Sequence, residues 1–149
     1  MGFTPLEGLV MGQRCGDIDP SIVDFLEEEE HLTTKKVLNI FNKQSGLLGL
    51  SEKSSDMRKL LKISHEGDEK ATLAIDIFCY RLAKKIASYI VPLEKIDALV
   101  FTGGIGENAA PIREKTMALL TPLSLKALVI PTNEEKMIAL DALRLTEGS

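Results

Sequence analysis

The apolar positions of the chain first recur at helical spacing and later form short continuous runs. The longest helical pattern covers residues 68–90, where apolar side chains return at three- and four-residue steps. Two short runs, 98–101 and 127–130, contain no charged side chain and are typical of strands covered on both faces of a sheet. This order predicts an α/β fold in which parallel strands are flanked by helices.

Helix start signals divide the N-terminal part of the chain. Asp19, which is followed by a proline, favours a helix over residues 20–30. Thr33 or Thr34 can cap a second helix, which stops near Gly46. A pair of helices is therefore expected before the long helix.

The C-terminal part carries similar signals. Pro111 favours a helix over residues 111–120. Thr132 and Glu135 have the spacing of a capping box, which predicts a last helix through about Leu145.

A glycine cluster directly follows the first apolar run. Gly103, Gly104 and Gly106 lack Cβ atoms at three of four positions, which permits positive φ and lets a ligand lie on the backbone. A strand, a glycine turn and a helix N-terminus together present several N–H donors to an anion. The spacing fits this anion site and a tight turn without a ligand equally well.

Two further segments contain candidate binding residues. Arg14 lies between Gly12 and Gly16 and can bind two oxygens of a phosphoryl group, although solvated surface arginines are more common. Asp56 and Arg58 offer a carboxylate for ribose hydroxyls and a flat guanidinium for an adenine ring or a phosphate. The alternative is an exposed pair at the start of a helix.

Glu134 follows the second apolar run. Capping does not explain this carboxylate, and at the carboxyl end of a strand in an α/β sheet it would face the ligand crevice.

Composition limits the classes of protein to be considered. The 149 residues fit one domain, and 44% hydrophobic with 27% charged residues is a globular composition. No apolar run approaches the ~20 residues that cross a bilayer, and the N-terminus lacks a secretory pattern, so we expect a cytoplasmic protein without a membrane partner. The net charge of −4 makes nucleic acid an unexpected partner, and local cations must hold any phosphate.

Cysteines and histidines lack the spacing of a metal or redox site. Cys15 and Cys79 are expected to be reduced thiols. His31 and His65 are far apart and have no paired ligands, so no transition-metal site is expected.

Three stretches resemble the acetate kinase family of the sugar kinase and actin superfamily. Residues 101–108, FTGGIGEN, resemble the adenosine-side glycine motif of that family. Residues 1–12 with Arg14 and GDIDP at 16–20 match a second stretch, and VIPTNEE at 129–135 matches a third. Their order and identities are those of the C-terminal half of the family.

The resemblance implies a ribonuclease H-like, actin-type ATPase domain over residues 1–149, with the N-terminal domain absent. The family transfers the γ-phosphoryl group of ATP reversibly to acetate or a similar short-chain carboxylate, using Mg²⁺ and releasing ADP. Its members form homodimers. This chain would supply the nucleotide-binding half, and we expect it to be inactive alone.

The same resemblance assigns site residues. Arg14 would stabilise the transferring phosphoryl group, and Glu134 would help to hold Mg²⁺. The nucleotide would be held by Asp56, Met57 and Arg58 together with Gly104, Ile105, Gly106, Glu107 and Asn108.

One departure from the family and two alternatives accompany this interpretation. The connection near 124–126 is shorter than in the family. Gly104 to Ala109 also fits the G-x-G-x-x-A fingerprint of a dinucleotide-binding module, although Ser124 stands where an acidic ribose ligand is expected. The second alternative is a non-catalytic dimerisation domain.

Overall fold

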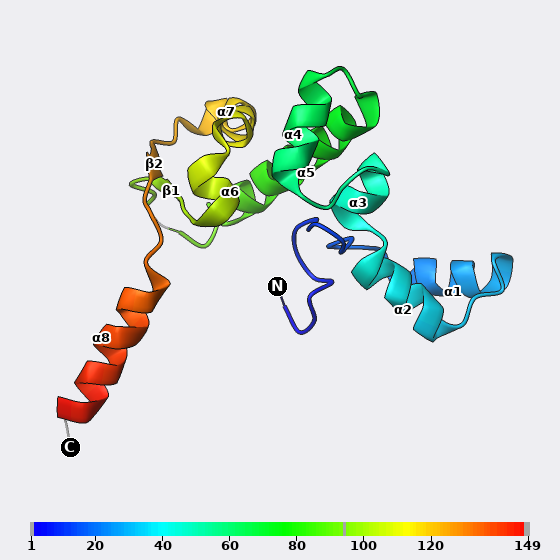
Figure 1. Cartoon of the computed structure of the whole chain (residues 1–149), viewed down its shortest axis with the longest axis horizontal. Helices are drawn as coiled ribbons and strands as arrows, with labels where there is room; N and C mark the ends of the chain where they lie inside the picture. Colours follow the sequence, from blue (N-terminus) through cyan, green and yellow to red (C-terminus); the bar gives the residue numbers. More distant parts are fainter. Residues whose placement is uncertain (1, 94, 148–149) are drawn as a thin grey trace.

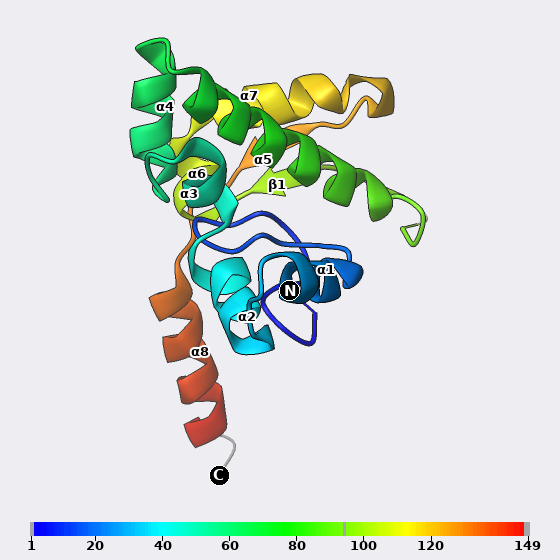
Figure 2. The same cartoon turned by 90° about the vertical axis from the view of Figure 1, so that its right-hand side faces the viewer.

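The computed structural model describes residues 2–93 and 95–147. A run of helices comes first, a small sheet with its crossover helices follows, and a final helix projects from the rest of the molecule (Figure 1 and, after a quarter turn, Figure 2). No helix in the described part of the chain has the length and apolar character needed to cross a bilayer.

Two expected start residues bind the first turns of their helices, although the N-cap position of α1 is Pro20 rather than Asp19. The Asp19 carboxylate accepts a hydrogen bond from the Ser21 N–H at 2.9 Å, and the Thr33 hydroxyl accepts one from the Lys36 N–H at 3.4 Å. The third and fourth helices were not predicted, since only a pair of helices was expected before the long helix. The five helices are α1 (Ser21–Glu29), α2 (Thr34–Lys43), α3 (Gly46–Ser51), α4 (Met57–His65) and α5 (Glu69–Ser88).

Helix α5 forms the centre of the core and packs against α3, α4 and α7 (Ala110–Leu119). The predicted apolar stripe is confirmed in its first half, where Ala71, Ala74 and Ile75 are buried. The helix ends at Ser88 rather than near residue 90. Tyr89, which falls within the predicted range 68–90, is therefore outside the helix and 56% exposed.

Two three-residue strands, β1 (Leu99–Phe101) and β2 (Ala127–Val129), pair in parallel, with Leu99 opposite Ala127. The crossover between them contains α6 (Gly103–Asn108), α7 and a 3₁₀ turn over Thr121–Leu123. The predicted parallel α/β arrangement is confirmed. Such a crossover brings the carboxyl ends of the two strands to the same edge of the sheet.

The prediction that both strands are buried on both faces is wrong for this structure. Phe101 is 8% exposed, whereas its neighbour Val100 is 46% exposed. Successive side chains of a strand point to opposite faces, so only one face of β1 is covered. All three residues of β2 are exposed.

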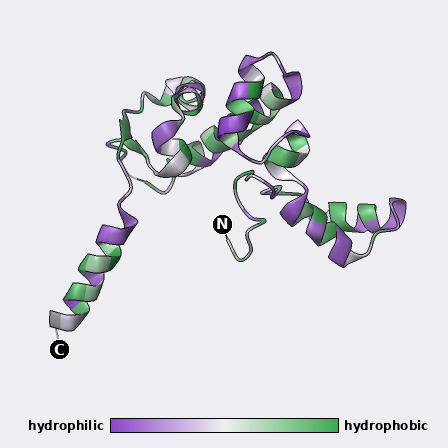
Figure 3. Ribbon diagram, in the orientation of Figure 1, coloured by the Kyte–Doolittle hydropathy of each residue, from purple (hydrophilic) through white to green (hydrophobic). Residues whose placement is uncertain are grey.

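Helix α8 (Glu134–Glu147) lies apart from the core, and its side chains at 134–146 are all exposed. Figure 3 shows apolar and polar residues mixed along it. The capping box expected from Thr132 and Glu135 does not form. Instead the Asn133 side chain accepts a hydrogen bond from the Lys136 N–H at 3.0 Å, since the Thr132 hydroxyl is engaged elsewhere.

Candidate functional site

Arg14 lies on a turn that the neighbouring helices hold in place. The Met11 N–H donates to the Arg14 carbonyl at 3.1 Å, which closes the turn. The first N–H groups of α3, from Leu47 and Leu48, donate to the carbonyls of Met11 and Gly12 at 2.9 Å. These helix N–H groups need partners outside the helix, and the turn supplies them.

The glycines near Arg14 allow close packing of the backbone. A Cβ on Gly12 would lie 2.9 Å from the Ser55 carbonyl oxygen. Gly46 has φ +63°, and a Cβ there would lie 2.2 Å from the Met11 carbonyl oxygen. The turn that contains Arg14 therefore packs closely against the start of α3 and against Ser55.

A cavity of about 740 Å³ opens beside this turn. Arg14, Gln13 and Ser55 are among its lining residues, and other lining residues come from α2. The Arg14 side chain is partly exposed, and its Nη1 lies 3.9 Å from the Met11 sulfur. The guanidinium is thus accessible to a ligand in the cavity.

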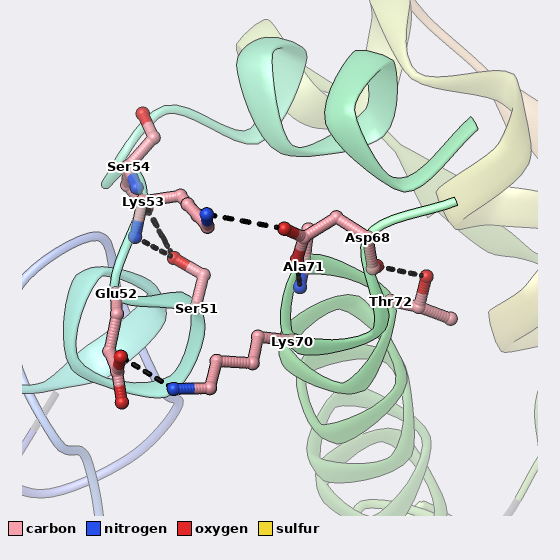
Figure 4. A network of polar contacts seen from close by, with 8 residues as sticks. All are labelled: Ser51, Glu52, Lys53, Ser54, Asp68, Lys70, Ala71 and Thr72. Carbon is pink, nitrogen blue, oxygen red and sulfur yellow. Dashed lines mark hydrogen bonds and ion pairs between the residues drawn. The ribbon is translucent and has the colours of Figure 1, made fainter. Parts of the chain in front are cut away.

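The loop that precedes α4 is tied to the start of α5 by a polar network (Figure 4). The fully buried Ser51 hydroxyl accepts hydrogen bonds from the N–H groups of Lys53 and Ser54. Lys53 pairs with Asp68, the cap of α5, at 3.4 Å. This network fixes the backbone that leads to Asp56.

Asp56 and Arg58 pair with each other. The Asp56 carboxylate accepts from the Arg58 N–H at 2.9 Å and from Nε and Nη2 at 3.1 and 2.7 Å. The hydrogen bond from the Arg58 side chain, more than any other interaction, lowers the pKa of Asp56 to about 2. The carboxylate therefore stays ionised at neutral pH, and the Arg58 side chain is 87% exposed.

Met57 differs from its two neighbours. Its side chain is 4% exposed and belongs to the hydrophobic core with Leu60. The side chain therefore anchors α4 to the core and does not face solvent.

The glycine cluster forms the start of helix α6 rather than an open loop. Gly103 has φ +72°, and added Cβ atoms on Gly103 or Gly104 would meet no other atom within 4 Å. A Cβ on Gly106 would lie 3.3 Å from the Phe101 carbonyl carbon. Gly106 thus allows α6 to pack closely on β1, whereas the first two glycines leave the surface open.

The N–H of Gly103 already has partners within the chain. It donates to Glu107 Oε1 at 2.8 Å and to the Thr132 hydroxyl at 2.9 Å. Glu107 Oε1 also accepts from the Thr132 N–H at 2.8 Å. The Glu107 carboxylate therefore binds one N–H group of the glycine cluster and one that follows β2.

Glu107 links the ends of the two strands through these bonds, and we call this arrangement the Glu107–Thr132 link. Hydrogen bonds from the Thr132 N–H, the Thr132 hydroxyl and the Gly103 N–H hold the pKa of Glu107 below its usual range. At the other end of α6, Asn108 Nδ2 donates to the Gly104 carbonyl at 3.0 Å.

Glu134 is the exposed first residue of α8, two positions after Thr132. The described residues contain no group of three or more His, Cys, Asp or Glu side chains placed to hold a metal ion. A lone carboxylate still suits Mg²⁺, which keeps several waters and binds one or two carboxylates together with phosphates.

The structure thus places the predicted site residues in two groups. Arg14 lies near the loop of Asp56, since Ser55 lines the same cavity. The α6 residues lie beside Thr132, which precedes Glu134. Sequence reasoning missed the α2 lining and the Glu107–Thr132 link, although polar residues at helical spacing on α2 could have indicated the former.

In comparison with solved structures, the chain is similar to kinases that have an actin-like α/β fold. It superposes on a propionate kinase from Francisella tularensis with a TM-score of 0.89 and 45% identity, covering 93% of this chain and 41% of that one. For the acetate kinase of Porphyromonas gingivalis the TM-score is 0.88 at 36% identity, covering 98% and 43%.

A model of the Acetokinase family matches residues 1–127, and the chain belongs to that family. Acetate kinase from Shewanella frigidimarina is 51% identical over 169 positions, which include 97% of this chain. The chain spans 42% of the length of that relative. Since 169 positions exceed the 149 residues here, the relative contains residues without a counterpart in this chain.

Proposed function

We propose that this chain is the nucleotide-binding half of an acetate kinase-type phosphotransferase, which converts ATP and acetate reversibly to ADP and acetyl phosphate. The supporting observation is the 51% identity to an acetate kinase across 97% of this chain. Because the chain spans 42% of that relative, we expect further catalytic residues to come from the part that it lacks. The chain alone should bind nucleotide weakly and not turn over.

Charge neutralisation and positioning carry the proposed reaction. A carboxylate acceptor is already ionised near pH 7, so no base is needed to activate it. Arg14, accessible beside the 740 Å³ cavity, would neutralise the phosphoryl group as it moves between the two oxygens. Glu134 would hold Mg²⁺, which neutralises phosphate charge when bound.

The nucleotide would lie against two surfaces. Asp56 and Arg58 offer a paired carboxylate and an exposed guanidinium. On α6, the open surface at Gly104 lies close to Ile105, which is 38% exposed, and to Asn108. An adenine ring and a ribose can rest on such a surface without displacing side chains.

Three of the residues assigned to nucleotide binding would act indirectly, without contacting the ligand. Glu107 is engaged by backbone N–H groups, Gly106 packs on β1, and Met57 is buried. They would position the residues that contact the ligand. The family membership favours this kinase over a dinucleotide-binding module.

The proposed setting is a cytoplasmic homodimer. Apolar side chains on the sheet and α8, such as Val129 and Ile138 at 47% and 69% exposed, support association with further protein surface. A second copy of the chain, in the proposed homodimer, would cover them.

The experiment is Arg14→Ala in a chain that also carries the N-terminal half of the family. Loss of a cation that meets the phosphoryl group mainly in the transition state should lower kcat by about 10²–10³, with little change in nucleotide KM. Lysine at this position should restore activity only in part, because it lacks the bidentate geometry. A near-normal kcat for Arg14→Ala in acetyl phosphate formation would refute the role.

A further inference from the structure

Helix α2 presents a largely polar face, interrupted by Leu38, to the cavity beside the arginine turn. Lys35, Asn39 and Asn42 lie at positions i, i+4 and i+7 of this helix, and all three line the cavity. Lys43, the last residue of α2, lines it as well. With Arg14 and Gln13 from the turn, these residues form what we call the cationic pocket.

Packing of the opposite face of α2 fixes this orientation. Val37 and Phe41 are 0% and 4% exposed and anchor that face in the protein. The Cys15 N–H also donates to the Phe41 carbonyl at 3.0 Å, which ties α2 to the arginine turn. The polar side chains of α2 are therefore held toward the pocket by the buried face behind them.

The charged residues that line the cationic pocket are all positive. Arg14, Lys35 and Lys43 line it, and none of the described lining residues is acidic, in a chain whose net charge is −4. None of these three cations forms an ion pair within the described part of the chain. In a second pocket, by contrast, Arg81 is engaged by Asp17 through its carbonyl at 3.0 Å and its carboxylate at 3.8 Å.

We infer that the cationic pocket binds a compact oxyanion of the phosphate or diphosphate class, with Lys35 and Lys43 as binding residues beside Arg14. Like charges that line one pocket repel each other, and a multivalent anion relieves this repulsion. The amide side chains of Gln13, Asn39 and Asn42 can donate further hydrogen bonds.

The size of the pocket agrees with such a ligand. Its volume of about 740 Å³ is in the usual range for small-molecule sites and leaves room for more than one phosphate group. Free inorganic pyrophosphate and the diphosphate of a nucleotide share this chemistry. The inference rests on the proposed function only for the role of Arg14, and it requires neither adenine binding nor turnover.

The test is a titration of the ¹⁵N-labelled 149-residue chain with sodium pyrophosphate at constant ionic strength, followed by NMR. We expect shifts at the Gln13 and Arg14 amides and at the side-chain amides of Asn39 and Asn42. The double variant K35Q/K43Q should weaken pyrophosphate binding by about three- to tenfold, which is the effect of removing two exposed charges near a bound anion.

A charge-matched control separates local from overall charge. Lys36 lies on α2 and Lys62 on α4, both are exposed, and neither lines the pocket. K36Q/K62Q should therefore leave the affinity within about twofold of the unmodified chain. Equal weakening by both double variants would overturn the inference, as would shifts confined to other parts of the chain.

Parallel titrations with ADP and adenosine distinguish the ligand sources and the two proposals. If adenosine shifts the NMR signals near Asp56 and Arg58 but pyrophosphate shifts none on α2, the inference of the cationic pocket is overturned and the proposed nucleotide site is not. Pyrophosphate binding that weakens in K35Q/K43Q supports the pocket even if adenosine does not bind. ADP binding that weakens by the same factor would assign the pocket to the nucleotide diphosphate.

Discussion

The helical part of the chain and its sheet end are both rich in apolar residues, yet they bury them very differently. Around α5, Leu60 and Ala74 are fully buried. At the sheet end, Val129 of β2 and Leu143 of α8 are 47% and 51% exposed. The helical part therefore derives its stability from a closed core, whereas the sheet end depends more on hydrogen bonds such as the Glu107–Thr132 link.

The largest expected effect comes from matched leucine truncations in the two regions. Leu60→Ala removes a fully buried side chain and should lower the free energy of unfolding by about 2–5 kcal/mol. Leu143→Ala on α8 should change it by less than about 1 kcal/mol, because that side chain is half exposed already. Urea unfolding followed by circular dichroism measures both, and equal losses would contradict the contrast.

Much of the fold could be predicted because periodicity and capping act locally. The Asp19 and Thr33 starts and the strand and helix order after Leu99 all follow from neighbouring residues. Burial of the strands could not be predicted, since it depends on which other segments pack there. Val100 is apolar, as buried residues usually are, yet it is 46% exposed.

The candidate site residues named from the sequence stay predictions, and their contacts could not be predicted. Glu107 was placed with the nucleotide residues, yet its carboxylate binds the Gly103 N–H, four residues before it, and the Thr132 N–H, 25 residues after it. Thr132 accordingly does not cap α8, and Asn133 does. Partners that are distant in sequence leave no periodic signal.

Removal of the Glu107–Thr132 link should loosen the sheet end without affecting the helical core. Glu107→Ala leaves the Thr132 N–H without this acceptor, and hydrogen exchange of that amide should rise by about tenfold or more. Glu107→Gln keeps an acceptor oxygen at the same place, so hydrogen exchange of the Thr132 amide should rise less. Exchange of core amides such as Cys79 serves as the internal reference, and uniform acceleration would show that the link supports the whole molecule.

Acid should destabilise the two regions at different pH values, and this effect should be smaller than those of the substitutions above. The folded pKa of Glu107 is lowered from its ordinary value of 4.5, so its contribution to stability is present above pH 4.5 and is lost as pH falls through the lower, folded value. Asp56, with a pKa of about 2 against an ordinary 3.8, loses its pairing with Arg58 only toward pH 2. The loss therefore begins below pH 4.5 for Glu107 and below pH 3.8 for Asp56, so the response of the sheet end to acid should begin at the higher pH.

Carbon-13 NMR titration of the carboxyl groups measures both pKa values directly. Arg58→Gln should raise the pKa of Asp56 toward 3.8, whereas Lys62→Gln, in the same helix, should not. An Asp56 pKa near 3.8 in the unmodified chain would show that the ion pair does not persist in solution.

Titration of the isolated chain with Mg-ADP and, side by side, with NAD tests the nucleotide site most directly. Amide NMR shifts should appear with Mg-ADP at Asp56 and Arg58 of the helical part and at Gly104 and Asn108 of the sheet end. NAD should bind more weakly, and a coupled assay should detect no acetyl phosphate formation by this chain alone. Tighter binding of NAD, or Mg-ADP shifts that spare both segments, would contradict the assignment of the chain as the nucleotide-binding half of a kinase.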